Sequence, residues 1–364
     1  MAAITAAMVK ELREVSGAGM MDCKKALTEC DGNLDAAIEF LRKSGAMKAE
    51  KKAGRIAAEG ICRIAFEGNK AAIVEVNSET DFVAKNETFQ NFVQAVAEQA
   101  LASNSVDVDD AFLAEAWKED TTKTVSDALV EKIATIGEKL TIRRFAKVEA
   151  PIVVGYVHGG GRIGALVAAE GEKNDATVEA LTNVAMQVAA MNPTYVSRED
   201  ISAEEINHLR EITIDSALND PATLPKPILN PLLDQAIAEK KWSEEDIAIF
   251  EEKKSNMNYV WNFLSDEAPK VIAKLALAKK AEIVGNKIFS GLVEGRISKQ
   301  LKEISLYDQV YVKAEDGKQT VAQYLKSVSA GLKVTKIVRF ETGEGLEKKE
   351  ENFAEEVAAQ LKKD

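Results

Sequence analysis

The sequence predicts an α+β protein made of a small helical bundle, a duplicated core of two related α+β subdomains, an inserted helical arm and a final helix. Apolar residues recur at helical spacing near the amino terminus, and β-rich runs bounded by turn residues follow. The order strand, strand, helix, strand then occurs a second time, after which the chain ends in another helical pattern. These three observations fix the expected class.

Residues 1–54 are expected to form three short helices. The apolar face of the first helix consists of Ile4, Met8, Leu12 and Val15. This helix ends at the glycines after Ser16, the second begins near Asp22, and the third ends at Gly45. Three short amphipathic helices predict a compact bundle of the ubiquitin-associated type, followed by a basic tether at residues 48–55.

Residues 55–148 are expected to form the first α+β subdomain. Two β-rich runs, at 61–66 and 71–76, are joined by a turn that contains glycine. The apolar stripe of the next helix consists of Phe89, Phe92, Val93, Val96 and Ala100. A helix at 124–136 and a strand at 140–148 complete this subdomain.

Residues 149–345 are expected to form the second subdomain, because the same order of elements recurs. Two strands flank a glycine-rich turn, and a helix at 177–191 follows. The closing strands also match, since residues 141–145 read TIRRF and residues 336–340 read KIVRF. We infer that the core arose by duplication.

A helical insertion of different composition is expected at about 203–291. Four of the seven prolines of the chain cluster within it at residues 221–231, and it contains two of the three tryptophans. The region from about 219 to 287 is a candidate for homodimer formation, for contact with a partner, or for stabilisation of the fold. The sequence does not decide between these roles.

Residues 346–364 are expected to form a C-terminal helical module. Asn352 is followed three residues later by Glu355, as in a capping box at the start of a helix. The apolar side of this helix would consist of Phe353, Val357 and Leu361.

The charge distribution suits a protein partner better than a nucleic acid. The formal net charge is −12, whereas residues 1–55 hold ten Lys or Arg and eight Asp or Glu. An acidic body with a mildly basic amino-terminal segment argues against an extended phosphate-binding surface. We therefore expect no direct binding to nucleic acid.

The cysteines and apolar runs indicate a soluble, cytoplasmic protein. Cys23, Cys30 and Cys62 are an odd number without CxxC spacing, which is typical of reduced thiols. The amino-terminal residues do not resemble a signal peptide, and no apolar run approaches membrane-spanning length. We expect no association with membranes.

The motifs that resemble catalytic or cofactor sites fail in context. Residues 159–164 fit GxGxxG, but a strand follows where a dinucleotide site needs a helix. His158 and His208 are the only histidines, and no paired cysteines complete a metal site. We therefore expect no enzymatic activity, no cofactor and no metal.

Two long blocks resemble the elongation factor Ts family. Residues 9–13 (VKELR) and 16–27 (SGAGMMDCKKAL) resemble its amino-terminal signature, and residues 75–85 (EVNSETDFVAK) carry its Thr-Asp-Phe-Val motif. Shorter matches lie at 136–138, 158–164, 166–169, 293–296 and 339–345. The resemblance covers residues 1 to about 217 and about 288 to 364.

The resemblance implies a guanine nucleotide exchange factor that binds GDP-bound elongation factor Tu, expels GDP and stays on nucleotide-free Tu until GTP binds. Asp81 and Phe82 would insert into the nucleotide domain of Tu and disturb its Mg²⁺ and phosphate contacts. The other contact residues that the resemblance implies are Thr80, Val83, Lys10, Leu12, Arg13, Met20, Met21, Lys24, Ile136, Gly137 and His158. The carboxy-terminal helix resembles a module that also docks on Tu.

The residue pattern alone leaves alternatives open. Phe82 precedes Phe89 by seven residues and fits the same buried helical stripe. Met20 and Met21 fit a role in plugging the bundle, and His158 fits an ordinary surface turn. Two other functional classes also stay open, a dinucleotide-binding enzyme and an adaptor for ubiquitin-like partners.

Overall fold

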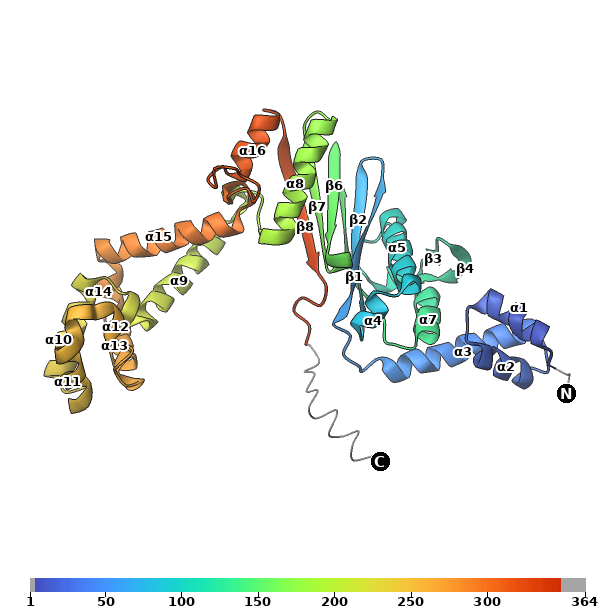
Figure 1. Ribbon diagram of the computed structural model, residues 1–364, viewed down its shortest axis with the longest axis horizontal. Coiled ribbons are helices and arrows are strands. Elements are labelled where there is room, and N and C mark those ends of the chain that lie inside the picture. The colour runs from blue at the N-terminus through green and yellow to red at the C-terminus, as the bar shows by residue number, and fades with distance from the viewer. Residues whose placement is uncertain (1–3, 348–364) are drawn as a thin grey trace. The chain divides into compact units, whose positions relative to one another are not determined.

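The computed structural model describes residues 4–347 and divides the chain into two compact units. The first unit comprises Met1–Asn192 and Gln323–Asp364, and the second comprises Pro193–Ala322. Helices and strands both contribute to the fold, which confirms the predicted α+β class (Figure 1).

The first unit begins with the three predicted helices, α1 (Ala6–Ser16), α2 (Met20–Glu29) and α3 (Leu34–Lys52). The prediction that the third helix ends at Gly45 is wrong, because α3 continues through most of the expected tether. Gly45 is buried against α7 (Val125–Ile136), where a Cβ atom would lie 3.5 Å from atoms of Val130 and Ala134. This glycine therefore allows two helices to approach closely and does not end one.

The first sheet has the order β1-β2-β5, with antiparallel pairing throughout. Its strands are β1 (Glu59–Glu67), β2 (Lys70–Ser78) and β5 (Thr141–Glu149). The predicted hairpin is confirmed, and the predicted apolar stripe is buried on α5 (Glu87–Ala102), which covers one face of the sheet. The smaller elements are α4 (Asp81–Ala84), α6 (Asp110–Ala114), β3 (Ala116–Trp117) and β4 (Asp120–Thr124).

The second sheet repeats this arrangement, with the order β6-β7-β8 and antiparallel pairing. Its strands are β6 (Ile152–His158), β7 (Ile163–Glu170) and β8 (Lys333–Glu341), and α8 (Asp175–Met191) covers its outer face. The shared strand order and the matching helix agree with the duplicated core inferred from the sequence.

The two sheets pack face to face in the first unit. Alternate residues of β1 point to opposite faces, so that Ile61 joins the core beneath α5 while Cys62 faces the second sheet. Cys62, Ile73, Leu166 and Phe340 are buried together between the sheets. Helices α5 and α8 lie on the two outer sides, which gives four layers (Figure 1).

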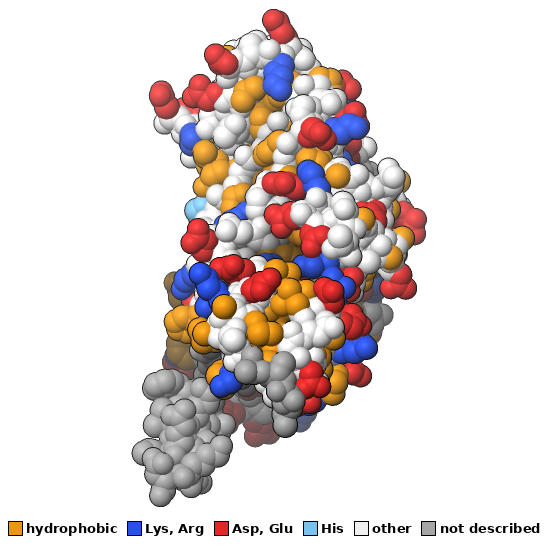
Figure 2. All heavy atoms as spheres, turned by 90° about the vertical axis from the view of Figure 1, so that its right-hand side faces the viewer, with side chains coloured by type: hydrophobic (Ala, Val, Ile, Leu, Met, Phe, Trp, Pro, Cys, Tyr) orange, Lys and Arg blue, Asp and Glu red, His pale blue; other side chains and the backbone are white. Residues whose placement is uncertain are grey.

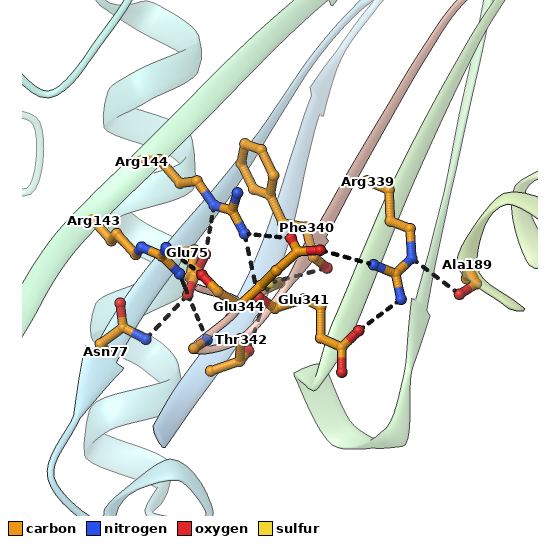
Figure 3. A network of polar contacts seen from close by, with 12 residues as sticks. Glu75, Asn77, Arg143, Arg144, Ala189, Arg339, Phe340, Glu341, Thr342 and Glu344 are labelled. Atoms are coloured by element: carbon orange, nitrogen blue, oxygen red, sulfur yellow. Dashed lines mark hydrogen bonds and ion pairs between the residues drawn. The ribbon is translucent and has the colours of Figure 1, made fainter. Parts of the chain in front are cut away.

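A buried carboxylate joins the first sheet to the segment after β8 (Figure 3). Glu75 is fully buried, and its two oxygens accept hydrogen bonds from Arg143 Nη1 at 2.9 Å and Arg144 Nε at 2.6 Å. Asn77 Nδ2 and the Gly343 N–H also donate to Glu75 Oε1, at 3.1 and 2.8 Å. All four donors bind the same carboxylate, so this network fixes the last residues of β2.

The second unit is a helical domain with its own apolar core. Its helices are α9 (Ala203–Asn219), α10 (Lys226–Ala238), α11 (Glu244–Lys253), α12 (Met257–Val260), α13 (Glu267–Ala278), α14 (Lys280–Val284) and α15 (Lys287–Ile304). The Trp242 indole is buried, donates to the Ala268 carbonyl at 2.9 Å and meets Phe250 and Trp261 edge to face. The expected helical insertion lies inside this unit, and α16 (Val321–Val328) follows at its end.

The expected C-terminal helix, with its cap at Asn352, lies outside the described residues. Among residues 4–347, no helix has the length and apolar character needed to cross a membrane. In the same part of the chain, no group of three or more His, Cys, Asp or Glu side chains is arranged to hold a metal ion.

Candidate protein-binding site

The segment after β2 presents an aromatic side chain to solvent. Thr80 caps α4, with its Oγ1 accepting a hydrogen bond from the Val83 N–H at 3.4 Å. Ala84 is buried and Val83 packs against the core, but the Phe82 side chain is 81% exposed. The alternative that Phe82 belongs to the buried stripe of α5 is therefore wrong.

Asp81 forms the polar side of this turn. Its carboxylate lies 2.6 Å from the Lys85 ammonium, one helical turn further along the chain. The hydrogen bond from Lys85 lowers the pKa of Asp81, which therefore stays ionised at neutral pH. The turn thus shows a carboxylate beside an exposed ring.

The structure brings this turn next to the end of α7. Ile136 is half-buried, and Gly137 ends the helix in the left-handed conformation with φ 86°. The next residue, Glu138, accepts hydrogen bonds from the N–H groups of Glu79 and Thr80, both at 3.1 Å, and from the Thr80 hydroxyl at 2.7 Å. The hydrogen bonds of Glu138 therefore join the end of α7 to the Thr80–Val83 turn.

The candidate residues of the bundle divide into exposed and buried groups. The side chains of Lys10, Arg13, Met20, Met21 and Lys24 are exposed. Leu12 is fully buried in the bundle core, so its side chain supports the surface from inside.

The two methionines open the second helix. Met20 is 60% exposed and Met21 75% exposed at the start of α2, which rules out the alternative that they plug the bundle. The side of the molecule on which the bundle lies carries interspersed acidic and basic side chains with apolar side chains between them (Figure 2).

His158 lies at the tip of the β6–β7 hairpin and is exposed. Its Nδ1 is 2.9 Å from the Tyr156 hydroxyl. The turn that follows packs on β1, since a Cβ atom on Gly161 would lie 2.7 Å from Ile61 Cβ. A strand follows this turn, which confirms that the GxGxxG match is a hairpin and not the start of a nucleotide-binding helix.

Sequence reasoning did not assign roles to Glu138 and to its neighbour in space, Glu79. Glu79 Oε1 accepts the Lys139 N–H at 2.6 Å and lies 3.2 Å from Arg55 Nη1. The only sequence signal for this pairing is a carboxylate directly after a glycine that ends a helix. Such a position leaves the side chain free to reach unpaired backbone donors on a neighbouring loop.

Comparison with known proteins identifies the family. The model of the Elongation factor TS family matches residues 79–344, which include the Thr80–Val83 turn, the α7 end and the second sheet. A protein of Clostridioides difficile (strain 630) named elongation factor Ts is 45% identical over 368 aligned residues, which cover 100% of both chains. That relative therefore also has a counterpart of the second unit. The chain belongs to the elongation factor Ts family of translation elongation factors.

Proposed function

We propose that this protein is the guanine nucleotide exchange factor of elongation factor Tu, and that it acts in the cytoplasm by binding alone, without catalytic residues. The observation that carries the proposal is the 81% exposure of Phe82 on a turn whose neighbours are held by the core. An exposed aromatic ring gains little for its own fold, whereas a ring that enters a partner's pocket is a typical binding anchor.

The exchange follows from a difference in affinity between nucleotide states of Tu. Phe82 and Asp81 enter the nucleotide domain of Tu, and the contacts of Tu to Mg²⁺ and the phosphates weaken as a result. By linkage, if the exchange factor weakens the binding of GDP to Tu by a given ratio, GDP weakens the binding of the exchange factor to Tu by the same ratio. GTP then displaces the exchange factor from nucleotide-free Tu.

The bundle supplies the second part of the proposed contact. Met20 and Met21 offer a pliable apolar patch, since the methionine side chain adapts to irregular surfaces. The exposed Lys10, Arg13 and Lys24 steer this patch towards an acidic surface. Further contacts come from the Ile136–Gly137 turn and the His158 hairpin.

Stopped-flow release of a fluorescent GDP analogue from Tu tests the proposal. The protein should accelerate release in proportion to its concentration, and Phe82→Ala should lower the second-order rate by about 30-fold or more, as expected for an anchor worth about 2 kcal/mol. Tyr259→Ala is the matched control, because Tyr259 is a 60% exposed aromatic residue in the second unit. It should exchange as fast as the unmodified protein.

Two results would contradict the proposal. The first is an unchanged rate of GDP release in the presence of the folded protein, whether or not the protein binds Tu. The second is equal exchange by the Phe82→Ala variant, which would place the working element elsewhere. Because Phe82 is exposed, its truncation should leave the melting temperature unchanged, so a loss of activity will not reflect unfolding.

A further inference from the structure

Building on the proposed function, we infer that Glu138 is a positioning residue that fixes the turn carrying Phe82 for insertion into the partner. Neither the charge of Glu138 nor a contact with the partner is its main contribution. It acts through hydrogen bonds to the segment that precedes Phe82.

Both oxygens of the Glu138 carboxylate are used within the protein. Oε2 accepts the N–H groups of Glu79 and Thr80, and Oε1 accepts the Thr80 hydroxyl. Since Glu138 follows Thr80 by 58 residues, these bonds join two loops that are distant in sequence.

A second carboxylate closes the link in the opposite direction. Glu79 accepts the Lys139 N–H, so each loop binds the backbone of the other through a glutamate. The Lys139 ammonium also donates to the Arg55 carbonyl at 2.8 Å, and Arg55 pairs with Glu79. The backbone before the Phe82 turn is thus held at successive residues.

Thr80 transmits this constraint to Phe82. Its hydroxyl donates to Glu138 and accepts from the Val83 N–H, so the bond to Glu138 selects the side-chain rotamer that caps α4. The direction of Phe82 then depends on how α4 is set, because its own ring is not held by the core. A turn that is ordered before binding loses less conformational entropy in the complex.

A double-mutant cycle in the GDP-release assay tests this role. Glu138→Ala should lower the second-order exchange rate about 10-fold, the size expected when intramolecular hydrogen bonds that order the turn are lost. In the Phe82→Ala background the same substitution should change the rate by less than about 2-fold, because the anchor to be positioned is gone.

Glu138→Gln separates positioning from charge. The glutamine oxygen can accept the two backbone N–H groups and its amide can donate to the Thr80 hydroxyl. We therefore expect Glu138→Gln to restore most of the exchange rate that Glu138→Ala loses. Equal loss in both variants would overturn the inference and indicate a charge contact with Tu.

Asp127→Ala is the matched control, because Asp127 lies on α7 and Glu138 follows the end of this helix. Asp127 accepts the Thr124 N–H at 3.0 Å at the opposite end of α7, so this variant also loses a carboxylate-to-backbone bond. It should exchange normally. Hydrogen exchange should show faster exchange of the Thr80 amide in Glu138→Ala than in Asp127→Ala, and equal rates would contradict the clamp.

The outcomes distinguish this inference from the proposed function. If Phe82→Ala exchanges normally, the proposed function fails. If Phe82→Ala is slow but Glu138→Ala is normal, or if the two losses are fully additive, only the positioning role fails. Should Glu138→Ala not fold, Thr80→Val removes the same hydroxyl link from the other loop and should slow exchange in the same Phe82-dependent way.

Discussion

Replacing Glu75 by alanine should destabilise the first unit strongly, because it removes the common acceptor of a buried network. Glu75 is fully buried, whereas the Arg143 and Arg144 side chains are 22% and 28% exposed. Removing one partner of a buried ion pair typically costs about 3–5 kcal/mol. Arg144 keeps an ion pair with Glu344 at 3.4 Å and its position 4.3 Å from the Phe340 ring centroid. We therefore expect a loss near the lower limit, about 3 kcal/mol.

Glu149→Ala is the matched control for this substitution. Glu149 lies on β5 and pairs with Lys70 at 3.5 Å, but both side chains are more than half exposed. An exposed pair contributes at most about 1 kcal/mol. The two variants thus each remove one glutamate carboxylate from neighbouring strands of the same sheet, and the two carboxylates differ in burial.

Native-state hydrogen exchange of peptides from β2, β5 and residues 341–345 measures the effect locally. In Glu75→Ala these peptides should lose protection equivalent to about 3 kcal/mol. Peptides of the second unit, which has its own core, serve as an internal reference. A loss no larger than that of Glu149→Ala would show that the buried network does not stabilise the sheet, and our reasoning from burial would be refuted.

Two further predictions concern titration. Burial raises the pKa of Asp246, but hydrogen bonds from Ser265 and Ser243 outweigh it and the net pKa is lowered. The stabilisation that ionised Asp246 gives is therefore complete above the unfolded pKa of about 3.9 and is lost as the pH falls through the folded pKa. Unfolding of the second unit, followed by tryptophan fluorescence, should depend less on pH below about 4 in Asp246→Asn than in the unmodified protein. Equal dependence of the unfolding free energy on pH in the two proteins would contradict this. Burial raises the pKa of Cys62 to about 12, so at pH 8 only about one Cys62 thiol in 10⁴ is ionised. Ellman's reagent should therefore modify Cys30 well before Cys62, and peptide mass spectrometry would show the order. Rapid labelling of Cys62 in the native protein would argue against its burial.

The sequence was most informative where a local pattern of apolar residues corresponds to one buried face of a helix or strand. The β1–β2 hairpin follows from two β-rich runs joined by a turn that contains glycine, and the α5 stripe follows from a period of 3.6 residues; both are present. The end of α3 was missed because Gly45 is a stop signal locally, whereas the packing of α7 gives it a different use. In the acidic stretch between α5 and α7 the pattern predicted no element. The structure nevertheless has a short helix there, α6, which Asp109 caps and whose Phe112 side chain is buried.

The environment of Phe82 shows why the candidate site was harder to predict than the fold. A spacing of seven residues to Phe89 places both rings on one face only if a single helix connects them. The chain instead forms α4, stops at Lys85 and restarts at Asn86, whose side chain caps α5. This restart breaks the helical phase, so Phe89 is buried and Phe82 is not. The family motif identified Phe82, while periodicity favoured the core.

The architecture around Phe82 suits the proposed exchange function, in which the protein must change its partner more than itself. Binding energy displaces GDP only to the extent that it favours the nucleotide-free state of Tu, and any part used to order the exchange factor is lost to that purpose. Here β2 is fixed by the Glu75 network, and the segment directly after it is held by Glu138 before the partner arrives. The Phe82 ring is left uncovered on this support. In the proposed function, a rigid sheet, a clamped turn and an exposed aromatic side chain would thus direct the energy of docking into Tu, which is the physical requirement for exchange without chemistry.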